Sequence, residues 1–168
     1  MPAALEEQIE LTFAAAPGLS EYTDSVGATV VARGVNYGTG FEIALKIREL
    51  SGLVVEAYSP ADLMHGPIAA IQPAWPVIAV APTGPSQLSV GEVVPALVSR
   101  NARLIAVTDV PELLEQARTP LPLIPGVPEW LSPLVAVVPG QVTAMRLAQQ
   151  RGRDVDSPPG LHKVTLTR

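Results

Sequence analysis

The apolar positions follow two different patterns along the chain. Short and almost continuous apolar runs, rich in β-branched residues, are typical of strands that are covered on both faces of a parallel sheet. Such runs occur at 28–33, 54–58, 77–82 and 104–109. A fifth run, at 119–125, contains three prolines and is suited only to a sheet edge. Stretches with a helical repeat surround these runs, and we expect helices at 3–15, 38–50, 87–100, 111–118 and 128–151.

The strands and helices therefore alternate with short connections. This order predicts a doubly wound α/β fold, in which a parallel sheet carries helices on both faces. In such sheets, ligands bind at the carboxyl ends of the strands. We divide the chain into an N-terminal helical segment or linker (1–27), the α/β domain (28–152) and a polar C-terminal tail (153–168).

Composition narrows the range of functions. A length of 168 residues suits one domain, and the absence of Cys excludes disulfides, thiolate zinc sites and cysteine nucleophiles. With only two His, we expect no metal site, and no motif predicts a cofactor. The net charge is -5 and the 11 Lys and Arg residues are scattered, which disfavours nucleic acid as a partner.

The distribution of apolar residues bears on location and assembly. No run of about 20 apolar residues predicts a membrane span, and the N-terminus is acidic and unlike a signal peptide, so we expect a cytoplasmic protein. Hydrophobic residues make up 48% of the chain and charged residues only 16%. We therefore expect apolar surface to be covered in an oligomer, with the N-terminal helix and the helix at 128–151 as candidate interfaces.

The helix at 38–50 carries the first candidate chemistry. Glu42, Lys46 and Glu49 have the spacing i, i+4, i+7 and share one face, while Ile43 and Ile47 would pack on the sheet. Two interpretations remain open. The three side chains form a solvated salt-bridge stripe, or they place a carboxylate beside a cation where it can transfer a proton.

Two strand-to-helix turns are candidates for binding an anion such as phosphate. RGVNYGTG (33–40) contributes Gly34 and Asn36, and APTGPSQ (81–87) contributes Thr83 and Ser86. Backbone N–H groups at such turns, together with a helix N-terminus, favour anions. Neither turn has a nucleotide-binding motif, and either could be an ordinary connection.

The remaining candidates lie outside the regular elements. His65, in LMHGP, lies at a break between short helices, where it is either a structural His or an acid or base at the carboxyl edge of the sheet. The tail contains Lys163 and would usually be a frayed end. If the tail contributes to a site, we expect it to fold back over the carboxyl edge of the sheet.

Two segments resemble a known family. ARGVNYGTGFEIALKIRELSGLVVEAYSPADLMHGPIAAI (32–71) and the tail GRDVDSPPGLHKVTLTR resemble the second sugar isomerase (SIS) domain of the glutamine–fructose-6-phosphate transaminase (isomerizing) family, the glucosamine-6-phosphate synthases. The likeness extends over roughly residues 4–168. It implies a single SIS domain with a five-stranded parallel sheet in the flavodoxin-like order 2-1-3-4-5.

The resemblance also implies roles for individual residues. Glu49 corresponds to the base that moves a proton between C1 and C2 of the sugar, with Lys46 nearby and Glu42 on the same helix. His65 corresponds to the residue that assists ring opening in the site of the neighbouring subunit. Lys163 corresponds to the tail lysine that contacts the open-chain sugar. The implied ligand is a hexose 6-phosphate such as fructose 6-phosphate.

The chain also departs from the family pattern. The family's main phosphate loop lies in a first SIS domain that is absent here, as is the glutaminase domain. Asp62-Leu63-Met64 replaces the usual Glu-Leu-Lys before the HGP turn. Two functions therefore remain: the isomerase part of a synthase-like aminotransferase, or a non-catalytic sugar-phosphate-binding or structural half-domain that needs a partner SIS domain. The partner could be a second copy of the chain.

Overall fold

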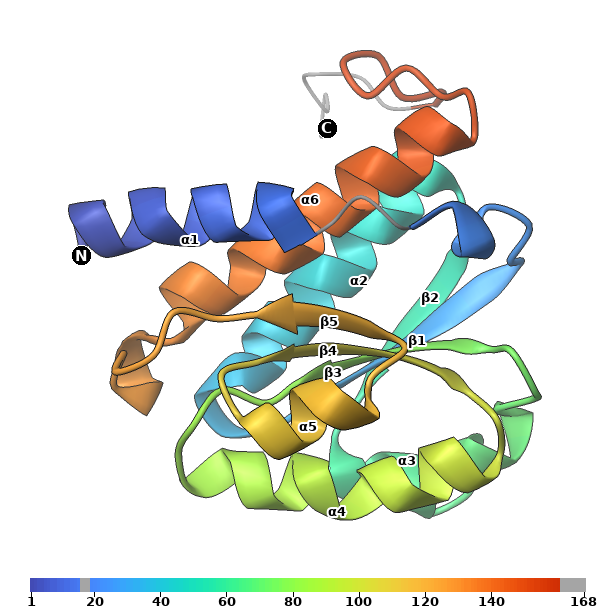
Figure 1. Ribbon diagram of the computed structural model, residues 1–168. Coiled ribbons are helices and arrows are strands. Elements are labelled where there is room, and N and C mark those ends of the chain that lie inside the picture. The colour runs from blue at the N-terminus through green and yellow to red at the C-terminus, as the bar shows by residue number, and fades with distance from the viewer. Residues whose placement is uncertain (16–18, 161–168) are drawn as a thin grey trace, which may run out of the picture.

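The computed structural model describes residues 1–15 and 19–160 (Figure 1). The strands are β1 (Gly27–Ala32), β2 (Val54–Tyr58), β3 (Pro76–Val80), β4 (Arg103–Thr108) and β5 (Thr119–Pro122). The α-helices are α1 (Pro2–Ala15), α2 (Tyr37–Ser51), α3 (Pro60–Met64), α4 (Pro85–Ser99), α5 (Pro111–Gln116) and α6 (Pro133–Gln150). Four short 3-10 helices join them: η1 (Leu19–Tyr22), η2 (Gly34–Asn36), η3 (Pro67–Ala70) and η4 (Glu129–Leu131).

The five strands form one sheet in the order β2-β1-β3-β4-β5, and every neighbouring pair is parallel. The three inner strands consist almost entirely of buried residues, as their unbroken apolar sequences predict. The predicted α/β fold and strand order are therefore confirmed. The carboxyl ends of all five strands lie along one edge of the sheet, called here the carboxyl edge, and the opposite edge is called the amino edge.

Helices cover both faces of the sheet (Figure 1). One apolar core lies beneath α2 and α6 and includes Ile43, Ile47 and Leu147. A second core lies on the opposite face, where Leu63 of α3, Leu97 of α4 and Leu113 of α5 are buried. The division has a direct consequence for the site, because side chains on α2 and on α3 belong to opposite sides of the sheet.

Helix α1 packs against α6 and the β5 edge rather than forming a separate segment. Its Gln8 is fully buried and its amide nitrogen donates to the carbonyl of Pro122, while its amide oxygen accepts from the N–H of Ile124. These bonds satisfy backbone groups beside the proline-containing strand β5, which lies at the sheet edge as predicted. The division at residue 27 remains a prediction.

Helix α6 differs in its start from the predicted helix at 128–151. Residues 129–131 form η4, and α6 begins with Pro133 at its first position, where the missing N–H costs no hydrogen bond. Pro139 lies inside α6 without ending it. The following Gly140 faces Ile43 of α2, and a Cβ at Gly140 would overlap three side-chain carbons of Ile43. The two helices therefore approach closely at this point.

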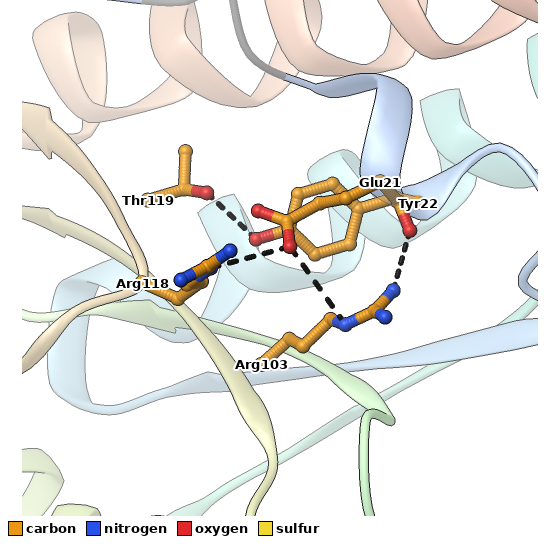
Figure 2. A network of polar contacts seen from close by, with 5 residues as sticks. All are labelled: Glu21, Tyr22, Arg103, Arg118 and Thr119. Atoms are coloured by element: carbon orange, nitrogen blue, oxygen red, sulfur yellow. Dashed lines mark hydrogen bonds and ion pairs between the residues drawn. The ribbon is translucent and has the colours of Figure 1, made fainter.

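A polar network fixes the segment that leads into β1 (Figure 2). The carboxylate of Glu21 lies 3.8 Å from Nε of Arg103 and 3.3 Å from Nε of Arg118. The hydroxyls of Tyr22 and Thr119 share a hydrogen bond of 2.6 Å, and burial of Tyr22 raises the pKa of its phenol above its ordinary value. These contacts connect η1 to β4 and β5.

Within residues 1–15 and 19–160, no helix is both long and apolar enough to cross a membrane.

The contact between α2 and α6 gives the first prediction. Gly140→Ala should have a free energy of unfolding roughly 1–3 kcal/mol lower than that of Gly38→Ala, because overpacking costs about that much, whereas both variants gain the better helix propensity of Ala. Gly38→Ala is the matched control, since no atom outside its local backbone lies within 4 Å of a Cβ there. Urea unfolding of both variants measures the difference. A Gly140→Ala protein as stable as the Gly38→Ala protein would contradict the close contact.

Candidate functional site

Three of the four charged residues of α2, Glu42, Lys46 and Glu49, lie together on its outward face. Nζ of Lys46 donates to Oε2 of Glu49 at 2.8 Å and lies 3.9 Å from Oε1 of Glu42. About a third of each side chain remains accessible. The structure therefore brings together the three α2 residues that the sequence predicts, and their geometry is compatible with both the salt-bridge stripe and the proton-transferring pair.

The local sequence explains why this face points outward. Ile43 and Ile47 are buried beneath α2, which fixes the rotation of the helix. The helix ends at Gly52, whose φ of 71° is the left-handed conformation that favours glycine at a helix C-terminus. Nη1 of Arg48 donates to the carbonyl of Val55 at 2.7 Å and holds the last turn against β2.

The ion pair between Lys46 and Glu49 changes the pKa of Lys46. The pKa of Lys46 is raised above its ordinary value of 10.5, and the hydrogen bond to Glu49 is the largest cause. The charges of Glu49 and Glu42 also raise this pKa, whereas partial burial of the ammonium lowers it. Lys46 therefore carries its positive charge beside the Glu49 carboxylate at neutral pH.

Glu49 lies at the amino edge of the sheet. Helix α2 starts after β1 at the carboxyl edge and ends before β2 at the opposite edge, so its last turn contains Glu49 there. The tail starts at this same end (Figure 1): Nη1 of Arg151 donates to the carbonyl of Ser25 at 3.0 Å, and the Arg153 guanidinium packs against Gly52. The described part of the tail therefore starts at the amino edge, where α6 ends, and the expectation that the tail folds over the carboxyl edge stays a prediction. Lys163 lies outside the described residues.

The turn after β1 is engaged in internal contacts. Asn36 is buried, and its amide nitrogen donates to Oγ of Ser132 at 2.7 Å, while its amide oxygen accepts from the Thr39 hydroxyl at 3.3 Å. Gly34 has a φ of 60°, and a Cβ there would overlap the Ser86 side chain. The turn thus connects β1 to α6 and lies against the turn after β3. Substrate binding by Gly34 and Asn36 remains a prediction.

The backbone N–H groups of the turn after β3 also bond to side chains of the chain itself. The backbone N–H of Thr83 donates to Oδ1 of Asp109 at 2.7 Å, and that of Ser86 donates to Oε1 of Glu129 at 3.0 Å. Asp109, Glu129 and Ser132 were not among the predicted site residues. Asp109 is the last residue of the predicted strand at 104–109, and its position at the carboxyl edge was an available signal. Nothing in the sequence marks Glu129, because the apolar pattern predicts it inside the helix at 128–151, whereas it lies in η4.

His65 lies on the other side of the sheet from Glu49. It follows α3, whose N-cap Ser59 accepts a hydrogen bond from the N–H of Asp62, with Pro60 at the first helical position. The His65 side chain is exposed, and the next residue, Gly66, has a φ of 149°. Because α2 and α3 cover opposite faces, His65 and Glu49 do not share one cleft within this chain. Among the described residues, no group of three or more His, Asp or Glu side chains could hold a metal ion.

The comparisons with known proteins agree with this architecture. The glutamine–fructose-6-phosphate aminotransferase [isomerizing] of Synechocystis sp. is 36% identical to 97% of the chain, which spans 26% of that relative. The C-terminal domain of the glucosamine-fructose-6-phosphate aminotransferase from Francisella tularensis superposes with a TM-score of 0.82 and 26% identity, over 92% of this chain and 44% of that one. Glucosamine-6-phosphate deaminase from Thermotoga maritima has the same fold, with a TM-score of 0.74 and 24% identity over 96% and 46% of the two chains.

The chain thus spans about a quarter of the length of its curated relative and under half of either solved chain. A sequence model of one family, the SIS domain, matches residues 22–145, which include all five strands and most of α6. The resemblance seen in the HGP turn and the α2 segment is therefore confirmed, and the chain belongs to the SIS domain family.

Proposed function

We propose that this chain is the hexose 6-phosphate-binding isomerase domain of a glucosamine-6-phosphate synthase-like enzyme. The observation that carries the proposal is the 2.8 Å pair of Lys46 and Glu49 on the outward face of α2, at the end of the fold where the C-terminal tail begins. The activities named for the Synechocystis relative and the Francisella domain support a phosphorylated hexose, such as fructose 6-phosphate, as the ligand.

The proposed chemistry needs one positioned carboxylate. Conversion of a 2-ketose to an aldose removes a proton from C1, forms an enediol, and returns a proton to C2 while the C1 hydroxyl loses its proton and the C2 oxygen gains one. Glu49 would take the C1 proton and deliver it to C2. Lys46 holds the Glu49 carboxylate in place through its ammonium. Lys163 would contact the open-chain sugar, and His65 would act in ring opening.

A second function is favoured by one specific observation, the separation of His65 and Glu49 by the sheet. A domain with its acid and its base on opposite faces would be a non-catalytic sugar-phosphate-binding half, and catalysis would require a partner SIS domain or a second copy. Isomerisation of fructose 6-phosphate to glucose 6-phosphate by the unmodified chain distinguishes the two functions. The aminotransferase activity of the relatives would need a glutaminase with its own nucleophile, and this chain contains no Cys.

Exposed apolar side chains support the proposed association. Leu5, Ile9 and Phe13 recur every fourth residue along α1 and are each about 40% exposed. Helix α1 and the adjoining α6 form one side of the molecule in Figure 1. A second copy of the chain or another SIS domain could cover this stripe.

The proton-transfer role gives the second prediction. Glu49→Gln should bind fructose 6-phosphate about as well as the unmodified chain, because the amide keeps the shape and the acceptor oxygen of the carboxylate. Isomerisation to glucose 6-phosphate should fall by roughly 10²–10⁴-fold, the usual contribution of a positioned base. Glu112→Gln on α5, on the opposite face, is the control and should retain full activity. An inactive unmodified chain would favour the half-domain, and an active Glu49→Gln chain would exclude Glu49 as the base.

The third prediction concerns the pKa of Lys46. The ion pair favours protonated Lys46 in the folded protein, so its contribution to stability is complete below pH 10.5 and is lost as the pH rises through the raised pKa. Glu49→Gln should lower the pKa of Lys46 more than Glu42→Gln does, since Glu49 makes the direct hydrogen bond. NMR titration of the Lys46 side chain measures both changes. Equal decreases in the two variants would contradict a dominant contact with Glu49.

The fourth prediction concerns assembly. Light scattering at micromolar concentration should give at least a dimer for the unmodified chain, and Ile9→Glu on α1 should shift the equilibrium toward monomer. Leu88→Glu is the matched control, because Leu88 is exposed on α4 on the other side of the sheet. A monomeric unmodified chain, or dissociation by Leu88→Glu alone, would exclude α1 as the interface.

A further inference from the structure

The turn after β3 has the backbone geometry of an anion cradle, but carboxylates of the chain itself occupy it. Parallel α/β sheets bind ligands at the carboxyl edge, and a turn that leads into a long helix presents N–H groups there. In this turn, the N–H of Thr83 donates to Asp109 at 2.7 Å and the N–H of Ser86 donates to Glu129 at 3.0 Å. The two amides that would contact a phosphate are therefore already engaged.

The turn is shaped around the Glu129 side chain. Gly84, with a φ of 154°, lies so close to Glu129 that an added Cβ would be 2.7 Å from both Cβ and Cδ of that residue. A Cβ at Gly34 would be 3.9 Å from Oε1 of Glu129 and would overlap Ser86. The Glu129 carboxylate thus lies between the turns that follow β1 and β3. Gly34 and Gly84 leave room for it because they have no side chains.

Buried hydrogen bonds hold Glu129 in this position. The Ser132 hydroxyl donates to the carbonyl of Glu129 at 2.6 Å and accepts from the amide of Asn36 at 2.7 Å. Asn36 is 1% exposed and belongs to η2, directly after β1. The position of Glu129 therefore depends on hydrogen bonds that connect it, through Ser132, to the carboxyl end of β1.

We propose that Glu129 and Asp109 are internal anions that exclude phosphate from the turn after β3 at the carboxyl edge of this domain. Their carboxylates accept the hydrogen bonds that a phosphate would need from Thr83 and Ser86, and their negative charges would repel a phosphate dianion placed there. The phosphate group of any ligand of this chain is consequently bound by residues outside the 82–87 turn. The inference goes beyond the proposed hexose phosphate function and does not depend on it, since inorganic phosphate is a sufficient probe.

The alternative is that Glu129 serves only as a helix cap. A cap stabilises α4 through the same hydrogen bond to Ser86, and its removal would cost stability without creating affinity for phosphate. Stability measurements alone would not separate the two roles. Phosphate binding by charge-removing variants separates them.

The experiment titrates the full chain with inorganic phosphate at pH 7 and constant ionic strength, and follows the amide NMR signals of Thr83 and Ser86. The variants are Glu129→Gln, Asp109→Asn and the double variant. Glu129→Gln keeps an oxygen that can accept from Ser86, so the fold should persist. Glu92→Gln is the matched control, because it removes one charge from α4 itself at a residue that lines a groove with Arg33 and Met64 rather than this turn.

We expect the unmodified chain and Glu92→Gln to show no saturable shift at these amides. Glu129→Gln should bind phosphate measurably, and the double variant about tenfold more tightly than the single variant, as expected for removal of a second nearby charge. If the double variant fails to fold, Glu129→Gln decides alone. Saturable binding at Thr83 and Ser86 in the unmodified chain, or no gain over it in a folded Glu129→Gln chain, would overturn the proposal.

Discussion

The close contact between α2 and α6 determines which residues this domain can present to a ligand. Gly140 lets α6 approach Ile43 without an intervening Cβ, and Ile43 and Ile47 fill the space between α2 and the sheet. Once these apolar residues face inward, the helical repeat places Glu42, Lys46 and Glu49 on the outward side. The same helix α6 also delivers the tail to the end of α2, where Arg153 packs on Gly52. A single packing contact thus orients both the charged helix face and the start of the tail.

The two edges of the sheet have consequently different properties. At the carboxyl edge, polar groups are paired with each other: Asn36 with Ser132, Thr83 with Asp109, and Ser86 with Glu129. Polar groups that are already paired gain little from a new ligand, because binding would first have to break those bonds. At the amino edge, Lys46 and Glu49 remain partly accessible. The chemistry proposed for this domain is therefore located on the face of a helix rather than in the loops where parallel α/β proteins usually bind ligands.

Sequence alone predicted the fold well because its strongest signals are local. The continuous apolar strands and the proline-rich β5 each reflect a short-range constraint, and the structure contains all of them. The charged face of α2 could also be predicted from the sequence, since helical spacing determines which residues share a face. The partners of the 82–87 turn could not be predicted, because Glu129 lies 43 residues from Ser86 and meets it only through the tertiary arrangement of η4. The place where the tail begins could not be predicted for a similar reason: the direction of α6, not the tail sequence, determines the edge at which the tail begins.

The separation of Glu49 and His65 constrains how a complete site could be assembled. Both residues are accessible, yet the sheet and its two apolar cores lie between α2 and α3. No side-chain rotation can cross that thickness, and moving either helix would expose a core that stabilises the whole fold. If both groups act on one sugar, the His must therefore come from a different SIS domain than the Glu, and each copy would present its two functional faces to two different neighbours. The exposed stripe on α1 is then distinct from the surface around His65, because α1 covers the same face as α2. An assembly through α1 alone would leave the His65 surface free, so a complete site requires a second contact that involves the α3 face.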